Sequence, residues 1–597
     1  MNKTVDVSRA DSEREGNPRE NRRRRVGLAA GAALLSTLAF TTVALAATGN
    51  LAQKSGTDGC ISVDGTAGDC ADGTALTGAS GVTVSPDGKN AYVASKIDNS
   101  VSVFDVDSSG NLTQKSGTDG CISEDGTDGA CADGKALGGA QAVTVSPDGK
   151  NVYVASGIAV AVLDRDTSTG ALTQKSGTDG CISEDGTSGA PNFSPGACVN
   201  GVALNGPSSV AVSPDGKNVY AAAPFSDAVD IFDRDTANGK LTQKAGTDGC
   251  ISKTSTGGAC VFGTAVDGAT TITVSPDGEN AYAASYFSDA VDVFDRDATT
   301  GKLTQKSGTD ACVSQSGSAG ACADGTALDG AQGVAISPDG KSAYVTSHFS
   351  DSVTIFDRNA STGVLTQKSG TDGCISQTGS GGDCVDGVAL NSAGSVTVSP
   401  DDKNVYVASP APSDAIAVID RDTSNGKLTQ KAGTEGCISE TGTGGLCLNG
   451  VALNGANSVA VAPDGKTAYG AASDSNAVSV FTREGGKLEG KATADKTQKQ
   501  KGKQIAVKVQ VKGDEALNAE ATGTISIKKK SYSLHTVRKS VAAGKKATLN
   551  LKPKKDKNNK KIAKGLKKSK GKATISVKLA DPAGNSKKTN LSVTLKR

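Results

Sequence analysis

The chain of 597 residues has no tryptophan, one methionine, two histidines and only 9 Tyr and 11 Phe. Because His348 and His535 are the only histidines, the sequence excludes a histidine-rich metal site and a repeated Ser-His-Asp arrangement. No long apolar run follows residue 46, so we expect no membrane-spanning helix beyond it. Glycine is abundant, with 75 residues, which favours tight turns between short strands over helices.

The net charge of +1 conceals a strong asymmetry along the chain. Residues 47–487 carry 26 basic and 51 acidic side chains, a net charge of −25, whereas residues 488–597 carry 30 basic and 7 acidic side chains, a net charge of +23. This division predicts an acidic main body followed by a basic C-terminal part.

The N-terminal region has the pattern of a secretory signal. Four arginines at 22–25 precede an apolar stretch over 26–46, which ends in the small-x-small sequence Ala44-Leu45-Ala46. We expect residues 1–46 to be a signal peptide cleaved before Ala47, and the mature protein to be secreted or located at the cell surface. An uncleaved anchor is the alternative, because 21 apolar residues can just span a bilayer. The arginines also weakly suggest twin-arginine export.

The remaining chain repeats itself seven times. The marker is the segment Leu-Thr-Gln-Lys, and each unit carries two cysteines, a Ser-Pro-Asp-Gly-type turn and an alternating apolar stretch in the same order. The marker begins at Leu112, Leu172, Leu241, Leu303, Leu365 and Leu428, with variants at Leu51 and Leu488. Repeats of about 60 residues that share one order of contents predict one repeated supersecondary unit.

Each unit reads as four short strands. In the fourth unit, an alternating strand over 272–274 stops at a proline, an Asp-Gly turn follows, and the partner strand contains Tyr282. A third strand over 291–297 and the Leu303 segment complete the unit. Four antiparallel strands repeated seven times predict an all-β fold, a seven-bladed β-propeller over 47–487.

These motifs also carry a family resemblance. Ser-Pro-Asp-Gly-Lys-Asn-Val-Tyr-Val-Ala-Ser over 146–156, and Val-Asp-Val-Phe-Asp-Arg-Asp over 291–297, resemble the YVTN-type repeat of lactonase-like seven-bladed propellers. The resemblance covers residues 51–487 in seven copies. It implies the propeller fold and, as an activity, lactone hydrolysis.

The repeat leaves one strand in excess, because eight Leu-x-x-Lys segments accompany seven copies of the inner strands. We expect residues 51–55 to supply the outermost strand of the last blade and so to close the ring. The Leu488 segment then leads into the next domain. The alternative is that the Leu488 segment closes the ring.

Fourteen cysteines, two in each unit, are expected to form seven disulfides within the units, because the total is even and the chain is exported. The predicted pairs are Cys60–Cys70, Cys121–Cys131, Cys181–Cys198, Cys250–Cys260, Cys312–Cys322, Cys374–Cys384 and Cys437–Cys447. Thiolate metal sites are the alternative, but no unit has a C-x-x-C or a nearby histidine. Acidic neighbours such as Glu124 and Asp125 lack calcium-loop spacing, so we assign no metal or cofactor site.

The basic C-terminal part follows an expected linker over 488–502. Five alternating segments over 503–597 predict a small β-sandwich, and the turn over 581–585 resembles that of bacterial immunoglobulin-like modules. Eleven lysines between Lys552 and Lys572 suggest attachment to an anionic cell-wall polymer. A solvated basic loop is the alternative. We do not expect nucleic-acid binding, because no aromatic residues interleave with the lysines.

The expected function is a non-catalytic extracellular scaffold for a ligand or a protein, acting as a monomer. A single active site should break the sevenfold repeat, and we identify few departures from it, so no catalytic residue is assigned. The alternative is a lactonase-type hydrolase, which would need a general base and a donor for the developing oxyanion.

One face is the candidate place for binding. Three consecutive units carry Phe-Ser-Asp turns, which should emerge beside the loops that hold the cysteines. The candidate residues are Phe225, Asp227, Tyr286, Phe287, Asp289, His348, Phe349 and Asp351. The alternative is that each Phe wedges between blades and each Asp caps a turn.

Overall fold

The computed structural model describes residues 49–188, 194, 196–484, 490–501, 504–513, 517–541, 545–580 and 586–597. The expected signal peptide lies outside these residues. In the part of the chain that is described, no helix is long and apolar enough to cross a membrane.

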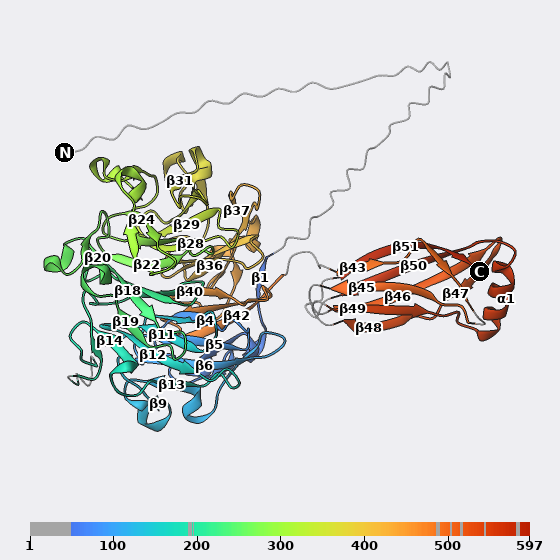
Figure 1. Cartoon of the computed structure of the whole chain (residues 1–597), viewed down its shortest axis with the longest axis horizontal. Coiled ribbons are helices and arrows are strands. Elements are labelled where there is room, and N and C mark those ends of the chain that lie inside the picture. Colours follow the sequence, from blue (N-terminus) through green and yellow to red (C-terminus); the bar gives the residue numbers. More distant parts are fainter. Residues whose placement is uncertain are drawn as a thin grey trace, which may run out of the picture. The chain divides into compact units, whose positions relative to one another are not determined.

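Seven sheets with one strand order follow each other along residues 51–483 (Figure 1). In blade 1, β4 (Ala79–Val84), β5 (Asn90–Ser95) and β6 (Ser100–Val106) pair antiparallel from the inside outward. The proline after each first strand ends the ladder, and a turn residue with positive φ, glycine in six blades and Asp402 in blade 6, reverses the chain. The all-β seven-bladed propeller predicted from the repeats is confirmed.

Blades 2 to 7 repeat these three strands. The innermost strands are β10 (Ala142–Val145), β16 (Ser209–Val212), β22 (Ala269–Val274), β28 (Ala331–Ile336), β34 (Ser395–Val398) and β40 (Ala456–Val461). The second strands are β11 (Asn151–Ala155), β17 (Asn218–Ala223), β23 (Asn280–Ser285), β29 (Ser342–Ser347), β35 (Asn404–Ser409) and β41 (Thr467–Ala472). The third strands are β12 (Ala159–Arg165), β18 (Ala228–Arg234), β24 (Ala290–Arg296), β30 (Ser352–Arg358), β36 (Ala415–Arg421) and β42 (Ala477–Arg483).

The outermost strand differs from the expected single strand, because a 3-10 turn divides it. In blade 1 the turn over Gly117–Gly120 separates β7 (Leu112–Gln114) from β8 (Cys121–Ser123), and both pieces pair with β6. A two-residue strand, β9 (Ala132–Asp133), then runs parallel to β8. Glycine-rich Gly-Thr-Asp-Gly interrupts the ladder, so each blade has six strands rather than four.

The same pieces recur in blades 2 to 6. They are β13 (Leu172–Gln174), β19 (Leu241–Gln243), β25 (Leu303–Gln305), β31 (Leu365–Gln367) and β37 (Leu428–Gln430). Their continuations are β14 (Cys181–Ser183), β20 (Cys250–Ser252), β26 (Cys312–Ser314), β32 (Cys374–Ser376) and β38 (Cys437–Ser439). The parallel strands are β15 (Val199–Asn200), β21 (Val261–Phe262), β27 (Ala323–Asp324), β33 (Val385–Asp386) and β39 (Leu448–Asn449).

The N-terminal strands close the ring. Strand β1 (Leu51–Gln53) pairs antiparallel with β42, as do residues of β2 (Cys60–Ser62), and β3 (Ala71–Asp72) follows β2. Figure 1 shows the blue strand β1 beside the orange strand β42. The expectation that residues 51–55 complete the last blade is confirmed, and Leu488 itself lies outside the described residues.

All seven predicted disulfides are present, six between cysteines ten residues apart and one, Cys181–Cys198, seventeen apart. The first cysteine of each pair lies within the outer strand and the second just before the short parallel strand. Each disulfide therefore fastens its loop to its own blade. Seven disulfides indicate an oxidising compartment outside the cytoplasm.

The strand directions give the propeller two distinct faces. The Ser-Pro-Asp-Gly-type hairpins, between the first and second strands, share one face with the turns between the third and outer strands. The turns between the second and third strands share the opposite face with the disulfide-linked loops. Buried clusters of both neighbouring sheets fill the space between adjacent blades, as Tyr92 and Val103 of blade 1 do with Val152 and Val154 of blade 2.

The C-terminal domain consists of two sheets. One contains β43 (Gly490–Thr493), β45 (Val507–Gly513) and β49 (Lys546–Leu551); the other contains β44 (Thr497–Lys499), β46 (Leu517–Ile527), β47 (Lys530–Ser533), β48 (Val537–Val541), β50 (Gly571–Ala580) and β51 (Ser586–Lys596). One core unites apolar side chains of both sheets, so the predicted β-sandwich is confirmed.

Two features of this domain differ from the expectation. The segment expected as a linker contributes strands β43 and β44. Helix α1 (Asp556–Leu566) lies within the lysine-rich stretch, where no helix was expected from the sequence, and it buries Ile562, Ala563 and Leu566. Apolar residues four apart occupy one face of the helix, so the lysines are left on its exposed side.

Candidate functional site

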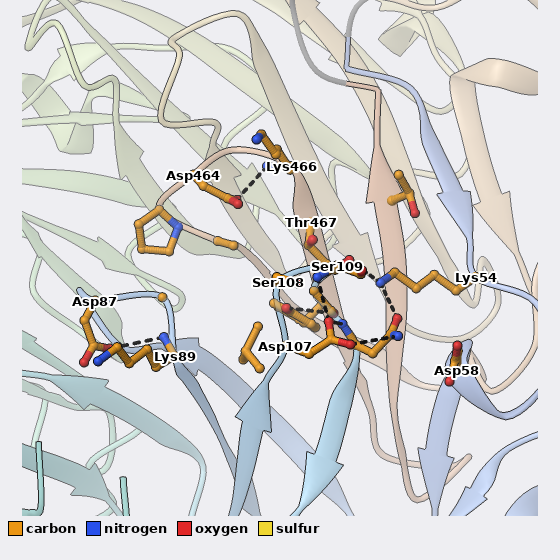
Figure 2. A pocket seen from close by; sticks show the side chains of 18 of the residues that line it. Lys54, Asp58, Asp87, Lys89, Asp107, Ser108, Ser109, Asp464, Lys466 and Thr467 are labelled. Atoms are coloured by element: carbon orange, nitrogen blue, oxygen red, sulfur yellow. Dashed lines mark hydrogen bonds between the residues drawn. The ribbon is translucent and has the colours of Figure 1, made fainter. Parts of the chain in front are cut away.

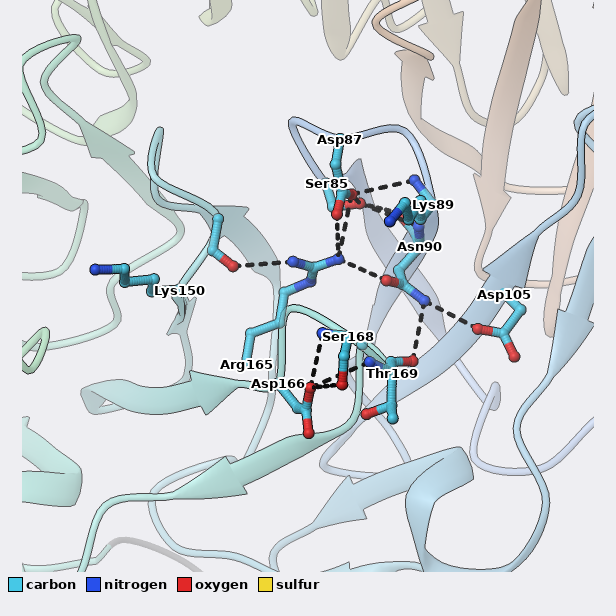
Figure 3. Close-up of polar contacts among 12 residues, drawn as sticks. Ser85, Asp87, Lys89, Asn90, Asp105, Lys150, Arg165, Asp166, Ser168 and Thr169 are labelled. Carbon is cyan, nitrogen blue, oxygen red and sulfur yellow. Dashed lines mark hydrogen bonds and ion pairs between the residues drawn. The ribbon is translucent and has the colours of Figure 1, made fainter.

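An arginine cluster joins neighbouring blades at six of the seven blade interfaces, and Figure 3 shows contacts of the one between blades 1 and 2. Arg165, at the end of the third strand of blade 2, donates from Nε to the Tyr92 hydroxyl of blade 1 at 2.6 Å. Its Nη2 contacts both Asp87 carboxylate oxygens at 3.2 Å and the Asn90 Oδ1 at 2.6 Å. Its Nη1 donates to the Gly149 carbonyl of its own blade. The guanidinium thus fastens two blades through charge-assisted hydrogen bonds.

The same cluster occurs at five further blade interfaces. It is centred on Arg234, Arg296, Arg358, Arg421 and Arg483. Each of these arginines donates to a tyrosine hydroxyl and to the hairpin aspartate of the preceding blade. At Arg421 a serine replaces the asparagine, and Ser342 Oγ accepts at 3.2 Å. Six interfaces of the ring therefore share one polar design.

The seventh interface, between blade 7 and blade 1, departs from this design. Val106 stands where the other blades have the arginine, and Thr467 stands where most have the asparagine. Tyr469 and Asp464 keep the tyrosine and aspartate positions. Thr482 replaces the aspartate that elsewhere pairs with the lysine of Leu-Thr-Gln-Lys. One substitution in blade 1 and two in blade 7 therefore meet at one place.

A cavity of about 1130 Å³ lies at this interface, on the hairpin face of the propeller (Figure 2). We call it the seam cavity. Its lining comes from the hairpins of blades 1 and 7, the turn over 107–111 and the N-terminal segment around Lys54. The departures from the repeat, Val106, Thr467 and Thr482, all belong to the lining. The side chain of Val106 is too short to reach across the interface as the arginines do, and the space that an arginine would fill is part of the cavity.

Lys54 illustrates the altered electrostatics of the seam cavity. Its six counterparts pair with an aspartate, as Lys115 does with Asp105 at 2.6 Å. With Thr482 in place of that aspartate, the Lys54 ammonium instead donates to the Ser109 carbonyl and to Asn111 Oδ1, both at 2.5 Å. Burial lowers the pKa of Lys54, against the attraction of Asp107 and Asp58. The ammonium keeps a third N–H for another acceptor.

Within the part of the chain that the structure describes, Asp464 and Tyr469 have no arginine bound to them of the kind that their counterparts hold. Among the described residues, the Asp464 carboxylate accepts a hydrogen bond from the backbone N–H of Lys466 at 2.9 Å. Tyr469 is fully buried and donates its hydroxyl to the Gly110 carbonyl at 3.0 Å, so its oxygen remains an acceptor. Burial and the nearby Asp464 raise the pKa of Tyr469, which keeps the hydroxyl protonated. The seam cavity thus combines a carboxylate, an ammonium and a buried phenol.

The candidate face on the disulfide-loop side has a different character. The side chains of Phe225, Phe287 and Phe349 are 74%, 65% and 60% exposed, so they do not wedge between blades. Tyr286, Phe287, His348 and Phe349 are linked by ring contacts, with the Tyr286 and Phe349 ring centroids 5.4 Å apart. Phe287 and Phe349 are exposed, whereas Tyr286 and His348 are half-buried. These side chains lie on the face opposite the seam cavity, and their use as contacts, like that of Phe225, stays a prediction.

The aspartates of those turns have a structural role. Asp227, Asp289 and Asp351 have positive φ and accept hydrogen bonds from backbone N–H groups of the next loop, at 2.7–2.9 Å. Asp414 makes the same contact with Gly455 in blade 6. The aspartates therefore connect the loops of neighbouring blades. The wedging alternative is wrong for the phenylalanines, because their side chains are exposed.

Sequence reasoning missed the seam cavity, although its signal is present. In six units the third strand ends in Arg, whereas in blade 1 it ends in Val106. The expectation of few departures from the repeat was wrong because each departure was judged within its own unit. The residues that meet belong to blade 1, blade 7 and the N-terminal segment, and only the closed ring brings them together.

The fold and this interface define a disulfide-linked seven-bladed propeller with one asymmetric seam. The sequence matches the family model "Lactonase, 7-bladed beta-propeller" over residues 47–175, 82–247, 138–316, 264–377 and 326–509, which together span 47–509. The chain belongs to this family. The expectation of a non-catalytic scaffold is thereby contradicted, and its alternative, a lactonase-type hydrolase, is better supported.

Several solved structures are similar in fold. A putative 6-phosphogluconolactonase from Bacteroides uniformis ATCC 8492 is 20% identical, with 58% of this chain and 82% of that chain covered and a TM-score of 0.39. The periplasmic gluconolactonase PpgL of Pseudomonas aeruginosa is 20% identical, with 58% and 83% covered and a TM-score of 0.40. Kuenenia stuttgartiensis hydrazine synthase is 19% identical, with 69% and 97% covered and a TM-score of 0.40. The comparison with curated proteins gives no match.

Proposed function

We propose that the propeller is a lactonase-type hydrolase, and that the seam cavity is where it opens a lactone ring. The observation that carries the proposal is the family match over residues 47–509. The break in the repeat supports placing the active site in the seam cavity. A single active site in a ring of seven similar blades needs reactive side chains that are engaged by other side chains in the remaining blades. Asp464 and Lys54 are such groups.

The chemistry follows from these two side chains. Asp464, as a carboxylate, accepts a proton from a water that attacks the lactone carbonyl carbon. The negative charge that develops on the carbonyl oxygen is stabilised by the remaining N–H of the Lys54 ammonium. The ring C–O bond then breaks, and Asp464 returns its proton to the leaving alkoxide. One lactone and one water thus give one hydroxy acid, with Asp464 and Lys54 restored.

The test is hydrolysis of a panel of five- and six-membered lactones, followed by acid release at constant pH. We expect Asp464→Asn to lower kcat/KM by about 100-fold or more, because the base is lost while the shape is kept. Asp119→Asn, which changes an exposed carboxylate in the 3-10 turn over Gly117–Gly120, is the matched control and should keep the wild-type rate. A wild-type protein that opens none of the lactones contradicts the activity. Hydrolysis that survives in Asp464→Asn contradicts the placement in the seam cavity.

We further propose that the C-terminal domain attaches the protein to an anionic surface polymer outside the cell. The supporting observation is a cavity of about 880 Å³ between the β46–β47 turn and helix α1, whose lining contains no acidic residue. Its lysines are Lys528, Lys529, Lys530, Lys561, Lys564 and Lys568, and Tyr532 lies among them. Clustered ammonium groups attract a chain of phosphates more strongly than scattered ones do.

A variant with Lys561, Lys564 and Lys568 changed to Gln tests this attachment on immobilised poly(glycerol phosphate). We expect its affinity at low salt to fall by about tenfold or more, since each lysine near an anionic surface contributes on the order of 1 kcal/mol. The matched control changes three exposed lysines outside the cavity, Lys508, Lys539 and Lys546, to Gln. If both variants lose the same affinity, the net charge of the domain explains the binding, and the proposal of a defined site is contradicted.

A further inference from the structure

We propose that the seam cavity contains a binding site for a guanidinium cation supplied from outside the chain. The site is the seventh copy of the arginine-binding cluster, with its acceptors retained and its arginine replaced by Val106. The proposal goes beyond lactone hydrolysis, because it requires binding and no reaction.

The acceptors of this seventh copy are the same groups that hold the six arginines. From the preceding blade, each cluster uses a tyrosine hydroxyl, an aspartate carboxylate and the side-chain oxygen of the first residue of the second strand. In blade 7 these are Tyr469, Asp464 and Thr467, and all three line the cavity. The fourth acceptor is a hairpin carbonyl of the arginine's own blade, and its blade 1 counterpart, Gly88, also lines the cavity.

The backbone around the seventh copy has kept its geometry. Tyr469 donates to the Gly110 carbonyl at 3.0 Å, just as Tyr92 donates to the Gly170 carbonyl at 2.9 Å. Gly110 approaches Thr467 so closely that a Cβ on it would lie 2.0 Å from Thr467 Oγ1, and Gly170 is equally close to Asn90. The acceptors are therefore held in the arrangement that binds a guanidinium elsewhere in the same ring.

The change from asparagine to threonine does not remove the site. At the interface of blades 5 and 6 the corresponding residue is Ser342, and its hydroxyl accepts from Arg421 at 3.2 Å. Thr467 offers a hydroxyl at the same position. A hydroxyl therefore replaces the amide oxygen within this protein while the arginine remains bound.

A guanidinium fits this site better than a simple ammonium. Its planar, fixed fork of N–H donors can reach a hydroxyl, a carboxylate and a carbonyl at once, as Arg165 does with Tyr92, Asp87 and Gly149. Figure 3 shows its contact with Asp87. An ammonium has three donors in a compact, strongly hydrated group that spans less of the site. The cavity is much larger than the cation alone, so the ligand can extend as an alkylguanidinium toward the hairpin face.

The experiment is a calorimetric titration of the full mature chain with methylguanidinium at millimolar concentrations. We expect saturable binding at least tenfold tighter than that of methylammonium. Val106→Arg supplies the missing side chain and should weaken the binding at least tenfold while raising the Tm. Val106→Ala, which leaves the acceptors untouched, should bind as the wild type does. Parallel titrations with N-acetyl-arginine amide distinguish an arginine side chain from a small alkylguanidinium as the source of the cation.

The outcomes separate this proposal from the proposed hydrolysis. Absence of saturable binding, or binding that Val106→Arg leaves unchanged, overturns the cation site, whatever the lactone assays give. If Val106→Arg fails to fold, Asp464→Asn serves instead and should lose at least tenfold in affinity, because it removes the charged acceptor. Saturable binding to a protein that opens no lactone supports the cation site and counts only against the hydrolase.

Discussion

Deletion of residues 47–56 is expected to lower the Tm of the propeller by about 5–10 °C. The deletion removes β1, whose Leu51 is only 2% exposed, and leaves the edge of β42 without its partner along residues 481–483. It also removes Gly49, whose carbonyl accepts from the buried Tyr406 hydroxyl at 2.7 Å. The Leu51 burial contributes about 2 kcal/mol. Loss of the Tyr406–Gly49 bond and of the backbone bonds from Gly49 to Glu484 and from Lys54 to Val480 costs about 1 kcal/mol each, so the sum is about 5 kcal/mol. Scanning calorimetry measures the effect.

A second variant tests whether this effect belongs to ring closure. Leu488→Ala alters the other terminal copy of the repeat marker and should leave the propeller transition unchanged. Leu51→Ala should reproduce part of the deletion, with a loss of about 2–4 kcal/mol for a buried leucine. An unchanged Tm after the deletion would mean that β1 contributes nothing to closure, in conflict with its pairing to β42.

The repeated elements of the propeller were predictable because each depends on local signals. The alternating third strands, the Pro-Asp-Gly turns and the cysteines ten residues apart all act within one unit, and all appear where expected. The divided outer strand was not predicted. The sequence does not show that Leu-Thr-Gln and Cys-Ile-Ser are two pieces of one outer strand, because this follows only from the pairing of both with the same third strand. The C-terminal helix was missed because its many lysines obscured the spacing of Ile562 and Leu566.

The candidate site required a different kind of information. Val106, Thr467 and Thr482 lie in three different strands, and each departure taken alone is one irregularity within its own repeat. Their joint effect depends on the contact between each arginine and the tyrosine of the preceding blade, a relation between residues 73 to 81 positions apart. Because the ring closes, blade 1 follows blade 7, and the missing arginine opens a cavity between the first and last units.

The same contacts predict the largest effect of a single substitution. We expect Arg483→Met to lower the free energy of unfolding by about 3–5 kcal/mol, because it leaves buried polar partners without their cation. Arg483 is 1% exposed and donates to the Tyr406 hydroxyl at 2.6 Å, Asp401 at 2.7 Å and Asn404 at 2.6 Å. Denaturant unfolding of wild type and variant at pH 7 measures the difference.

The pH dependence of that difference identifies its cause. Burial acts to raise the pKa of Asp401, but hydrogen bonds from Ser399 and the charge of Arg483 hold it below its usual value. A lowered pKa in the folded state stabilises the protein above the unfolded pKa of about 3.9, and this contribution is lost as the pH falls. In Arg483→Met the contribution is absent, so the deficit should be greatest near neutral pH and should shrink toward about pH 3.

An exposed ion pair of the same chain provides the matched control. Arg538 donates to Glu520 at 2.8 Å in the C-terminal sheet, but its side chain is 75% exposed. Arg538→Met should change the stability of that domain by no more than about 0.5 kcal/mol, since water replaces the lost contact. Equal effects of the two substitutions, or a deficit in Arg483→Met that does not vary with pH, would contradict the view that buried arginine clusters hold the blades together. The seam cavity would then reflect a change of sequence that costs the ring little stability.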